Sequence, residues 1–123
     1  MKGKKNPLGP IVFWLLIFAV QLAEGHAFPD HSEPSVGSKI SSSPSAVKIW
    51  FTEKLEPALS KIQVFDQSKK QIDRRDVQAF EGNAAILIVS LPQLHAGRYN
   101  VVWRVVSVDT HVTTGSFSFE VTN

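Results

Sequence analysis

Three polar residues, one near the start of the sequence and two near its end, could together bind a transition metal: His26, Asp109 and His111. In an extended chain, residues i and i+2 lie on the same side. Asp109 and His111 could therefore present a carboxylate oxygen and an imidazole nitrogen to one ion. His26 directly follows Gly25, where a secretory signal would be cleaved. Cleavage there would free the α-amine of His26, so that its amine and its ring could chelate the same ion.

These donors favour copper in its oxidised state. Three nitrogens and one oxygen suit the tetragonal preference of Cu(II), and Cu(II) heads the affinity order for nitrogen-rich sites. Zn(II) could use the same donors in a tetrahedral arrangement. The sequence has no cysteine and its single methionine is Met1, so a chain that begins at His26 would offer no soft sulfur ligand to Cu(I). The alternative is that Asp109 and His111 form only a hydrogen-bonded turn.

Residues 1–25 have the pattern of a cleaved secretory signal peptide. Three lysines precede an unbroken apolar run over residues 11–20, and Ala23 and Gly25 are the small residues that signal peptidase recognises. The alternative is a membrane anchor, but a spanning helix needs about 20 apolar residues. We therefore expect an exported protein that begins at His26.

The expected mature chain, residues 26–123, has the length of one domain. Loss of three lysines and Glu24 leaves 10 basic and 10 acidic residues, so its net charge is zero. This balance does not favour binding to nucleic acid or to an anionic membrane surface. Without cysteine the core must hold the fold without disulfides.

Short apolar runs separated by turn residues predict an all-β domain, an Ig-like Greek-key β-sandwich or barrel of about seven strands. Residues 26–45, rich in Ser, Pro and Gly, are expected to form an extended leading segment or an edge strand with turns. Residues 55–60 are expected to form one helical turn. The predicted strands are 46–52, 61–66, 84–91, 98–108 and 115–121. The predicted core aromatics are Phe51, Trp103, Phe117 and Phe119.

Four blocks of sequence resemble a known family. They are His-Ala-Phe at 26–28 with Ser-Glu-Pro-Ser-Val-Gly at 32–37, Val-Lys-Ile-Trp-Phe-Thr-Glu-Lys-Leu at 47–55, the stretch 97–111 that ends in Ser-Val-Asp-Thr-His, and Gly-Ser-Phe-Ser-Phe at 115–119. Together they make residues 26–123 similar to the CopC-type periplasmic copper-binding proteins of copper resistance. The third block is the most specific.

The resemblance implies a seven-stranded Greek-key barrel or sandwich with one Cu(II) site at one end. His26 would give its amine and a ring nitrogen, and His111 would give the second imidazole. Asp109 would give a carboxylate, or would anchor the geometry close to the metal. Glu53 matches an acidic residue that lies near the metal in some members, and its alternative role is that of a surface glutamate at a strand end. Because methionine is absent after Met1, the chain resembles the Cu(II)-only branch, and a Met-rich Cu(I) site is not supported.

The implied role is a monomeric, non-enzymatic Cu(II) carrier of the periplasm, serving copper buffering, resistance or delivery to an inner-membrane transporter of the CopD type. One alternative is a small copper mono-oxygenase-like enzyme, but such an enzyme needs an open coordination position that Asp109 would crowd. Another alternative is a metal-free β-sandwich interaction module. The remaining histidines, His31 and His95, are expected to be exposed; the alternative for His31, five residues after His26, is a weak additional ligand.

Overall fold

The structure, a computed structural model, describes residues 26–122. The predicted signal peptide, residues 1–25, lies outside the described residues. Within residues 26–122, no helix has both the length and the apolar character needed to cross a membrane.

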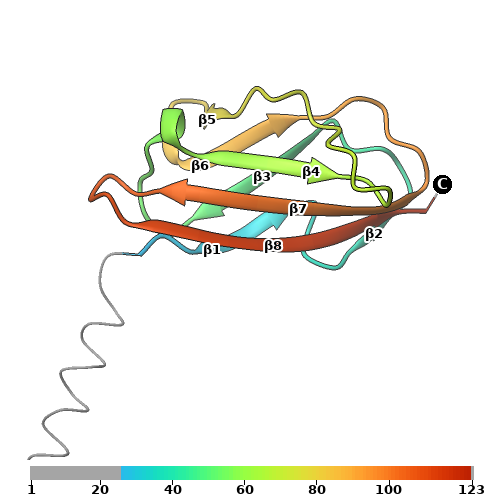
Figure 1. Cartoon of the computed structure of the whole chain (residues 1–123), viewed down its shortest axis with the longest axis horizontal. Coiled ribbons are helices and arrows are strands. Elements are labelled where there is room, and N and C mark those ends of the chain that lie inside the picture. The colour runs from blue at the N-terminus through green and yellow to red at the C-terminus, as the bar shows by residue number, and fades with distance from the viewer. Residues whose placement is uncertain (1–25, 123) are drawn as a thin grey trace, which may run out of the picture.

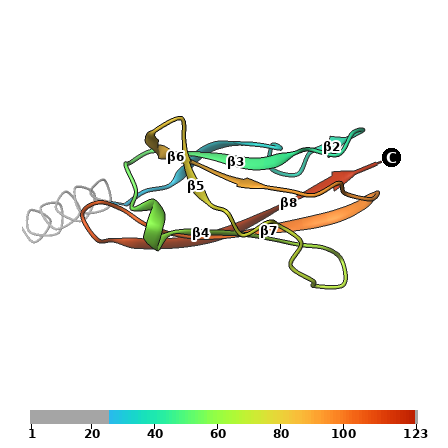
Figure 2. The same cartoon turned by 90° about the horizontal axis from the view of Figure 1, so that it is seen from above.

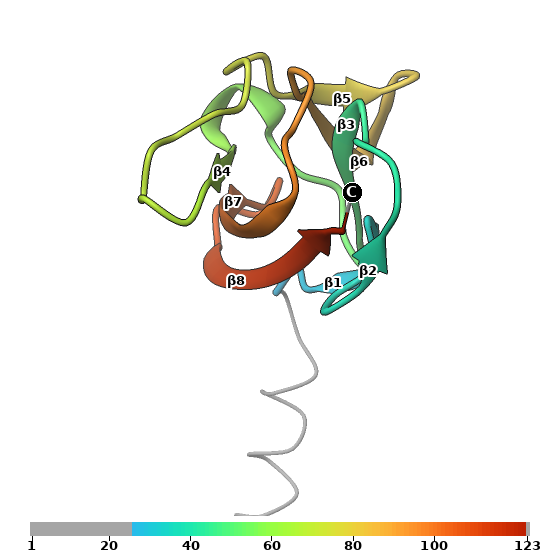
Figure 3. The ribbon, with the colours of Figure 1, turned by 90° about the vertical axis from the view of Figure 1, so that its right-hand side faces the viewer.

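Two four-stranded sheets pack face to face (Figures 1 and 2). Viewed from one end, the sheets enclose a common interior (Figure 3). This arrangement confirms the predicted all-β sandwich. All neighbouring strands are antiparallel except β2 and β8, which are parallel. One sheet has the order β1 (Pro29–Glu33), β3 (Ala46–Phe51), β6 (Asn83–Ser90) and β5 (Gln78–Phe80), and the other has the order β2 (Lys39–Ile40), β8 (Val112–Val121), β7 (Gly97–Val106) and β4 (Lys61–Phe65).

The core lies between the sheets because alternate residues of each strand point inward. Phe51 of β3 meets Trp103 of β7 edge to face, with ring centroids 5.6 Å apart. Gly115 of β8 pairs with Trp103, and a Cβ atom at Gly115 would lie 2.3 Å from the indole Cζ2 atom, so the indole occupies space that any side chain there would need. The predicted aromatics Phe51, Trp103 and Phe119 are buried, whereas Phe117 is only partly buried against the core.

The strand boundaries differ from the prediction mainly around the last hairpin. The strand predicted at 98–108 ends at Val106, and the strand predicted to begin at Gly115 begins at Val112. One ladder joins β7 and β8 from the Gly97–Val121 pair to the Val106–Val112 pair, so the chain must turn between these strands. The expected helical turn is the 3₁₀ turn η1 (Pro57–Leu59). The short strand β5 was not predicted.

Three segments meet at the end of the sandwich opposite the C-terminus (Figure 1). Residues 26–28 precede β1, the loop after β3 begins at Thr52, and residues 107–111 connect β7 to β8. Backbone hydrogen bonds join them, because Thr52 N donates to Phe28 O at 2.9 Å and Val108 N donates to Lys54 O at 3.1 Å. This end of the sandwich carries all four residues predicted to lie at the metal site: His26, Glu53, Asp109 and His111.

Candidate metal-binding site

The turn between β7 and β8 carries two of the predicted ligands. Ser107 N donates to His111 O at 2.9 Å, and Thr110 N donates to Ser107 O at 2.8 Å, which closes a three-residue loop. Thr110 has a φ of 73°, a left-handed conformation that is uncommon for a β-branched residue. The prediction that residues 109–111 are extended is therefore wrong. The hairpin requires a turn here because β8 begins at Val112, directly after His111.

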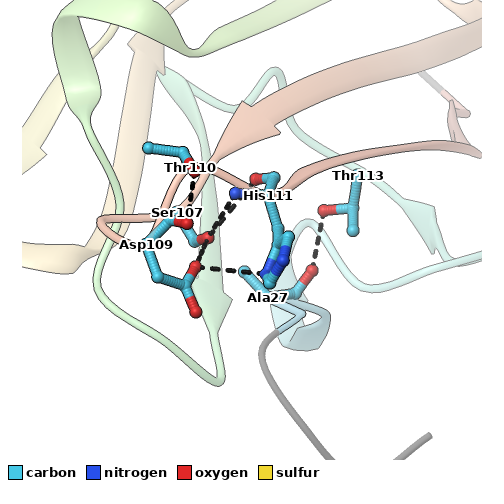
Figure 4. Close-up of polar contacts among 6 residues, drawn as sticks. All are labelled: Ala27, Ser107, Asp109, Thr110, His111 and Thr113. Atoms are coloured by element: carbon cyan, nitrogen blue, oxygen red, sulfur yellow. Dashed lines mark hydrogen bonds and ion pairs between the residues drawn. The ribbon is translucent and has the colours of Figure 1, made fainter. Parts of the chain in front are cut away.

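Asp109 and His111 nevertheless face each other, for a reason that the sequence argument missed. Ser107 Oγ donates a hydrogen bond to Asp109 Oδ1 and accepts one from His111 N at 3.2 Å (Figure 4). Asp109 Oδ1 lies 3.4 Å from His111 Nδ1. The turn and the buried Ser107 hydroxyl, rather than an extended strand, bring the carboxylate to the imidazole.

The Ser107 hydrogen bond also favours the ionised form of the Asp109 carboxyl. It is the main cause that holds the pKa of the Asp109 carboxyl below its usual value, and the adjacent His111 imidazole lowers that pKa further. A carboxylate that accepts a hydrogen bond in its charged form stays ionised to lower pH. Asp109 is therefore a carboxylate at neutral pH, as a metal-binding or imidazole-orienting role requires.

The N-terminal segment brings His26 to the same place. Ala27 is 1% exposed, and its carbonyl accepts a hydrogen bond from Thr113 Oγ1 at 2.8 Å (Figure 4). Phe28 N donates to Thr52 Oγ1 at 3.0 Å. With residues 27 and 28 fixed in this way, the ring of His26 stacks on the ring of His111, with centroids 4.8 Å apart and planes inclined by 24°.

The stacked rings of His26 and His111 place their nitrogen donors close together, but they do not form a coordination shell. Within residues 26–122, no three His, Cys, Asp or Glu side chains are placed so that they could hold a metal ion as they stand. A ring nitrogen binds a metal in the plane of its ring, so the rings of His26 and His111 must turn to converge on one ion. In the full chain the nitrogen of His26 is also bonded to Gly25, so its amine is available only after cleavage.

Glu53 is exposed in the loop after β3, at the same end of the sandwich. Its neighbour Lys54 accepts the hydrogen bond from Val108 N at 3.1 Å, which ties this loop to the loop of Asp109. The structure thus brings the segment of Glu53 beside the site. A role for Glu53 as a ligand stays a prediction.

The other two histidines lie elsewhere, and both are exposed as expected. His31 has contacts that the sequence did not reveal: its Nδ1 lies 2.8 Å from Asp30 Oδ2, and its ring stacks on Trp50 with centroids 4.1 Å apart. His95 lies in the loop before β7, and its carbonyl accepts a hydrogen bond from the Tyr99 hydroxyl at 2.7 Å.

Sequence reasoning missed the hydroxyl residues that hold the site, Ser107, Thr52 and Thr113. Ser107 had a sequence signal, because serine two residues before Asp109 is typical of a turn whose side chain bonds to nearby backbone. The threonines had none, because their partners lie in the N-terminal segment, far away in the sequence. Thr113 and Ala27, for example, are 86 positions apart in the sequence.

Comparison with known proteins identifies the family to which a chain with this geometry is similar. The family model described as the CopC domain matches residues 30–122. Copper resistance protein C of Xanthomonas campestris pv. juglandis is 32% identical, over 87% of this chain and 91% of that protein. The copper transport protein CutJ of Bacillus subtilis is 28% identical over 96% of this chain, but the chain spans only 22% of the length of that relative.

Solved structures agree with the sequence comparison. The crystal structure of CopC from Methylosinus trichosporium OB3b superposes with a TM-score of 0.74 and 31% identity. The superposition covers 79% of this chain and 94% of the other. The likeness therefore extends over almost the whole of that protein and includes the sandwich that positions the candidate site.

Proposed function

The chain belongs to the CopC family, and on that premise we propose that its mature form, beginning at His26, binds one Cu(II) ion for copper resistance. The proposed ligands are the amine and ring of His26, the ring of His111, and Asp109 as ligand or as orienting carboxylate. Membership of the family and the copper-resistance relatives support copper as the metal. The oxidation state, the single ion and the ligand set are our inference from the donors.

One observation carries the ligand assignment: the His26 ring stacks on the His111 ring although the two residues are 85 positions apart. The stack lies next to the Asp109 carboxylate, whose Oδ1 atom is 3.4 Å from His111 Nδ1. Two imidazole rings and one carboxylate at one end of the sandwich form a nitrogen-rich donor set.

The contact between Asp109 and His111 also suggests how the imidazole binds. Metal-binding histidines commonly direct one ring nitrogen at a carboxylate and coordinate through the other. Because Nδ1 of His111 faces Asp109, we assign Nε2 of His111 to the metal. An ion on Nε2 would lie on the opposite side of the ring from Asp109 Oδ1, so in this arrangement Asp109 orients the imidazole, and it would become a ligand only if the His111 ring turned.

We further propose that the signal peptide directs the protein to the periplasm. There it would act as a monomer and without catalysis, in copper buffering or in delivery to a membrane transporter of the CopD type. The relative CutJ, which is named as a copper transport protein and is much longer than this chain, supports a link to transport. Residues 1–25 support export through their signal-like pattern.

Moving the amino terminus by one residue tests the proposal most directly. We expect a chain that retains Gly25 ahead of His26 to bind Cu(II) more weakly, by roughly a hundredfold, because the amine is then a peptide nitrogen and the chelate is lost. The measurement is competitive titration of Cu(II) against a chelator of known affinity. A chain with one glycine added after Asn123 is the matched control and should bind like the mature protein. Equal affinity of the two extended chains would show that the N-terminal chelate is wrong.

Binding should also release protons, since the nitrogen donors must be neutral before they can coordinate. The Cu(II) affinity of the mature protein should therefore fall as the pH is lowered from about 8 to 6. Retention of Gly25 should reduce the number of protons released, because the His26 nitrogen is then an amide and not a titrating amine. Titration in buffers of different ionisation enthalpy measures that number, and an unchanged number would contradict the amine as a ligand.

A further inference from the structure

A hydrogen bond from Thr113 joins the two segments that carry the proposed histidine ligands. Thr113 lies two residues after His111 in β8, and its Oγ1 donates to Ala27 O at 2.8 Å (Figure 4). Ala27 directly follows His26. The contact therefore lies one residue from one ligand and two residues from the other.

The hydrogen bonds of Phe28 point to a different sheet. Phe28 exchanges hydrogen bonds with Thr52, which follows β3: Phe28 N donates to Thr52 Oγ1 at 3.0 Å and Thr52 N donates to Phe28 O at 2.9 Å. These bonds fix Phe28 against the sheet of β1 and β3. The Thr113 bond instead fixes Ala27 against β8, the strand that directly follows His111.

Given the proposed Cu(II) function, on which this inference rests, we propose that Thr113 is a positioning residue for the metal site. Its hydroxyl holds the backbone of Ala27 so that the amine and ring of His26 lie within reach of the ion bound by His111. Ordering a ligand before binding reduces the conformational entropy that binding must otherwise offset. Thr113 itself does not coordinate the metal.

The test is Thr113→Val in the chain that begins at His26. Valine keeps the shape of threonine and removes the hydroxyl. Loss of one net hydrogen bond should weaken Cu(II) binding by about two- to tenfold. Thr122→Val is the matched control, because Thr122 Oγ1 also donates to a backbone carbonyl of another segment, Ile40 O at 3.2 Å, at the far end of the molecule. Equal Cu(II) affinity of the two variants would overturn the proposal.

Two further variants separate positioning from packing. Thr113→Ser keeps the hydroxyl and should bind Cu(II) within about twofold of the unmodified protein, whereas a loss as large as that of Thr113→Val would assign the effect to packing and overturn the proposal. If Thr113→Val does not fold, Thr113→Ala carries the same test, with folding checked by circular dichroism.

A double-mutant cycle distinguishes this inference from the proposed function. In a chain that retains Gly25, His26 has lost its amine, so Thr113→Val should cost less affinity than it does in the chain that begins at His26. The same fold-loss in both chains would overturn the positioning role. A mature protein that binds no Cu(II), or binds it equally with and without Gly25, would instead overturn the proposed function.

Discussion

Two aspartate–histidine pairs lie on this domain, and only one of them is part of the candidate metal site. Asp30 and His31 are 2.8 Å apart, and Asp109 and His111 are 3.4 Å apart, measured between a carboxylate oxygen and Nδ1. The two histidine side chains are similarly exposed, at 54% and 50%. Each imidazole also stacks on another ring. By these measures alone the Asp30–His31 pair, with the shorter distance, would be the better site.

The difference lies in the ring on which each histidine stacks. His31 stacks on Trp50, whose indole nitrogen is only a hydrogen-bond donor. His111 stacks on His26, which can supply two nitrogen donors once its amine is free. The comparison teaches that a carboxylate beside an imidazole does not identify a metal site. A third donor must arrive from another segment, and here the N-terminal segment brings it.

Removal of the histidines should give the largest difference in Cu(II) affinity between the two pairs. His111→Ala should weaken Cu(II) binding by more than about a hundredfold, because even residues that only support a ligand commonly contribute tenfold to a hundredfold. His31→Ala and His95→Ala should change the affinity by less than about twofold. Competitive titration of each mature variant measures these losses. Similar losses for His111→Ala and His31→Ala would contradict the assignment of the site.

Removal of the carboxylates should give a smaller difference in Cu(II) affinity between the two pairs. Asp109→Asn keeps the size of the side chain but removes its charge, and it should weaken Cu(II) binding by about tenfold to a hundredfold. Asp30→Asn makes the same change in the other pair and should have no measurable effect on affinity. Electron paramagnetic resonance of the Cu(II) complexes should differ from that of the unmodified protein for Asp109→Asn alone. An altered spectrum for Asp30→Asn would show that the pairs are not distinct.

The hydroxyl that orders the Asp109 loop should have a smaller effect, and one that depends on pH. A carboxyl with a lower pKa in the folded than in the unfolded state stabilises the fold above the unfolded pKa, about 4, and this stabilisation is lost as the pH falls through the folded pKa. Because Ser107 is the main cause of the lowered Asp109 pKa, Ser107→Ala should reduce the free energy of unfolding more at pH 6 than at pH 2.

Denaturant unfolding of Ser107→Ala across this pH range measures the difference. The lost hydrogen bond to His111 N adds a pH-independent cost of about 1 kcal/mol. Ser32→Ala is the control, because the buried Ser32 hydroxyl donates to a backbone carbonyl, that of Pro34 at 2.8 Å, with no carboxylate involved. A cost for Ser107→Ala that is the same at both pH values would contradict the role of Ser107 in the charge of Asp109.

The smallest effect on copper is expected at the ring that supports His31. Trp50→Leu removes the stack with His31 and the contact with Lys48, whose Nζ lies 5.2 Å from the indole centroid. Loss of these contacts should lower the free energy of unfolding by about 1 kcal/mol. The Cu(II) affinity should not change. A weaker Cu(II) complex in Trp50→Leu would show that the Asp30–His31 pair contributes to binding.

Much of the fold could be predicted from the sequence because alternation and turn residues are local signals. In β3 and β7 apolar residues recur at every second position along one face, and the structure buries Val47, Ile49, Tyr99 and Val101 as this pattern indicates. The strand β5 escaped prediction because its three residues are too few to show a period. The turn at 107–111 was predicted only as an alternative, because Val108 continues the apolar pattern of the strand and outweighed the turn signal of Ser107 and Asp109. Pairing with β8 imposes the bend.

The candidate ligands were also readable, but their arrangement was not. Asp109 and His111 are close in sequence, so their juxtaposition needed only a local argument, although the extended chain used for it was wrong. The stack of His26 on His111 depends on the burial of Ala27, on the hydrogen bond from Phe28 N to Thr52 Oγ1 and on the one from Thr113 to Ala27, which only the folded chain defines. Long-range contacts of this kind leave no spacing pattern in a sequence.

The burial of Ala27 has a consequence for the precision of proteolytic processing. In a chain that begins at His26, the charged amine lies on an exposed residue. A cut one residue later would place that charge on Ala27, which is 1% exposed, and a charge so poorly hydrated is costly. An exopeptidase that removes His26 must also first free Ala27 from its packing. The fold therefore protects the one residue whose loss would abolish the proposed chelate, and it sets the correct amino terminus apart from a terminus shortened by a single position.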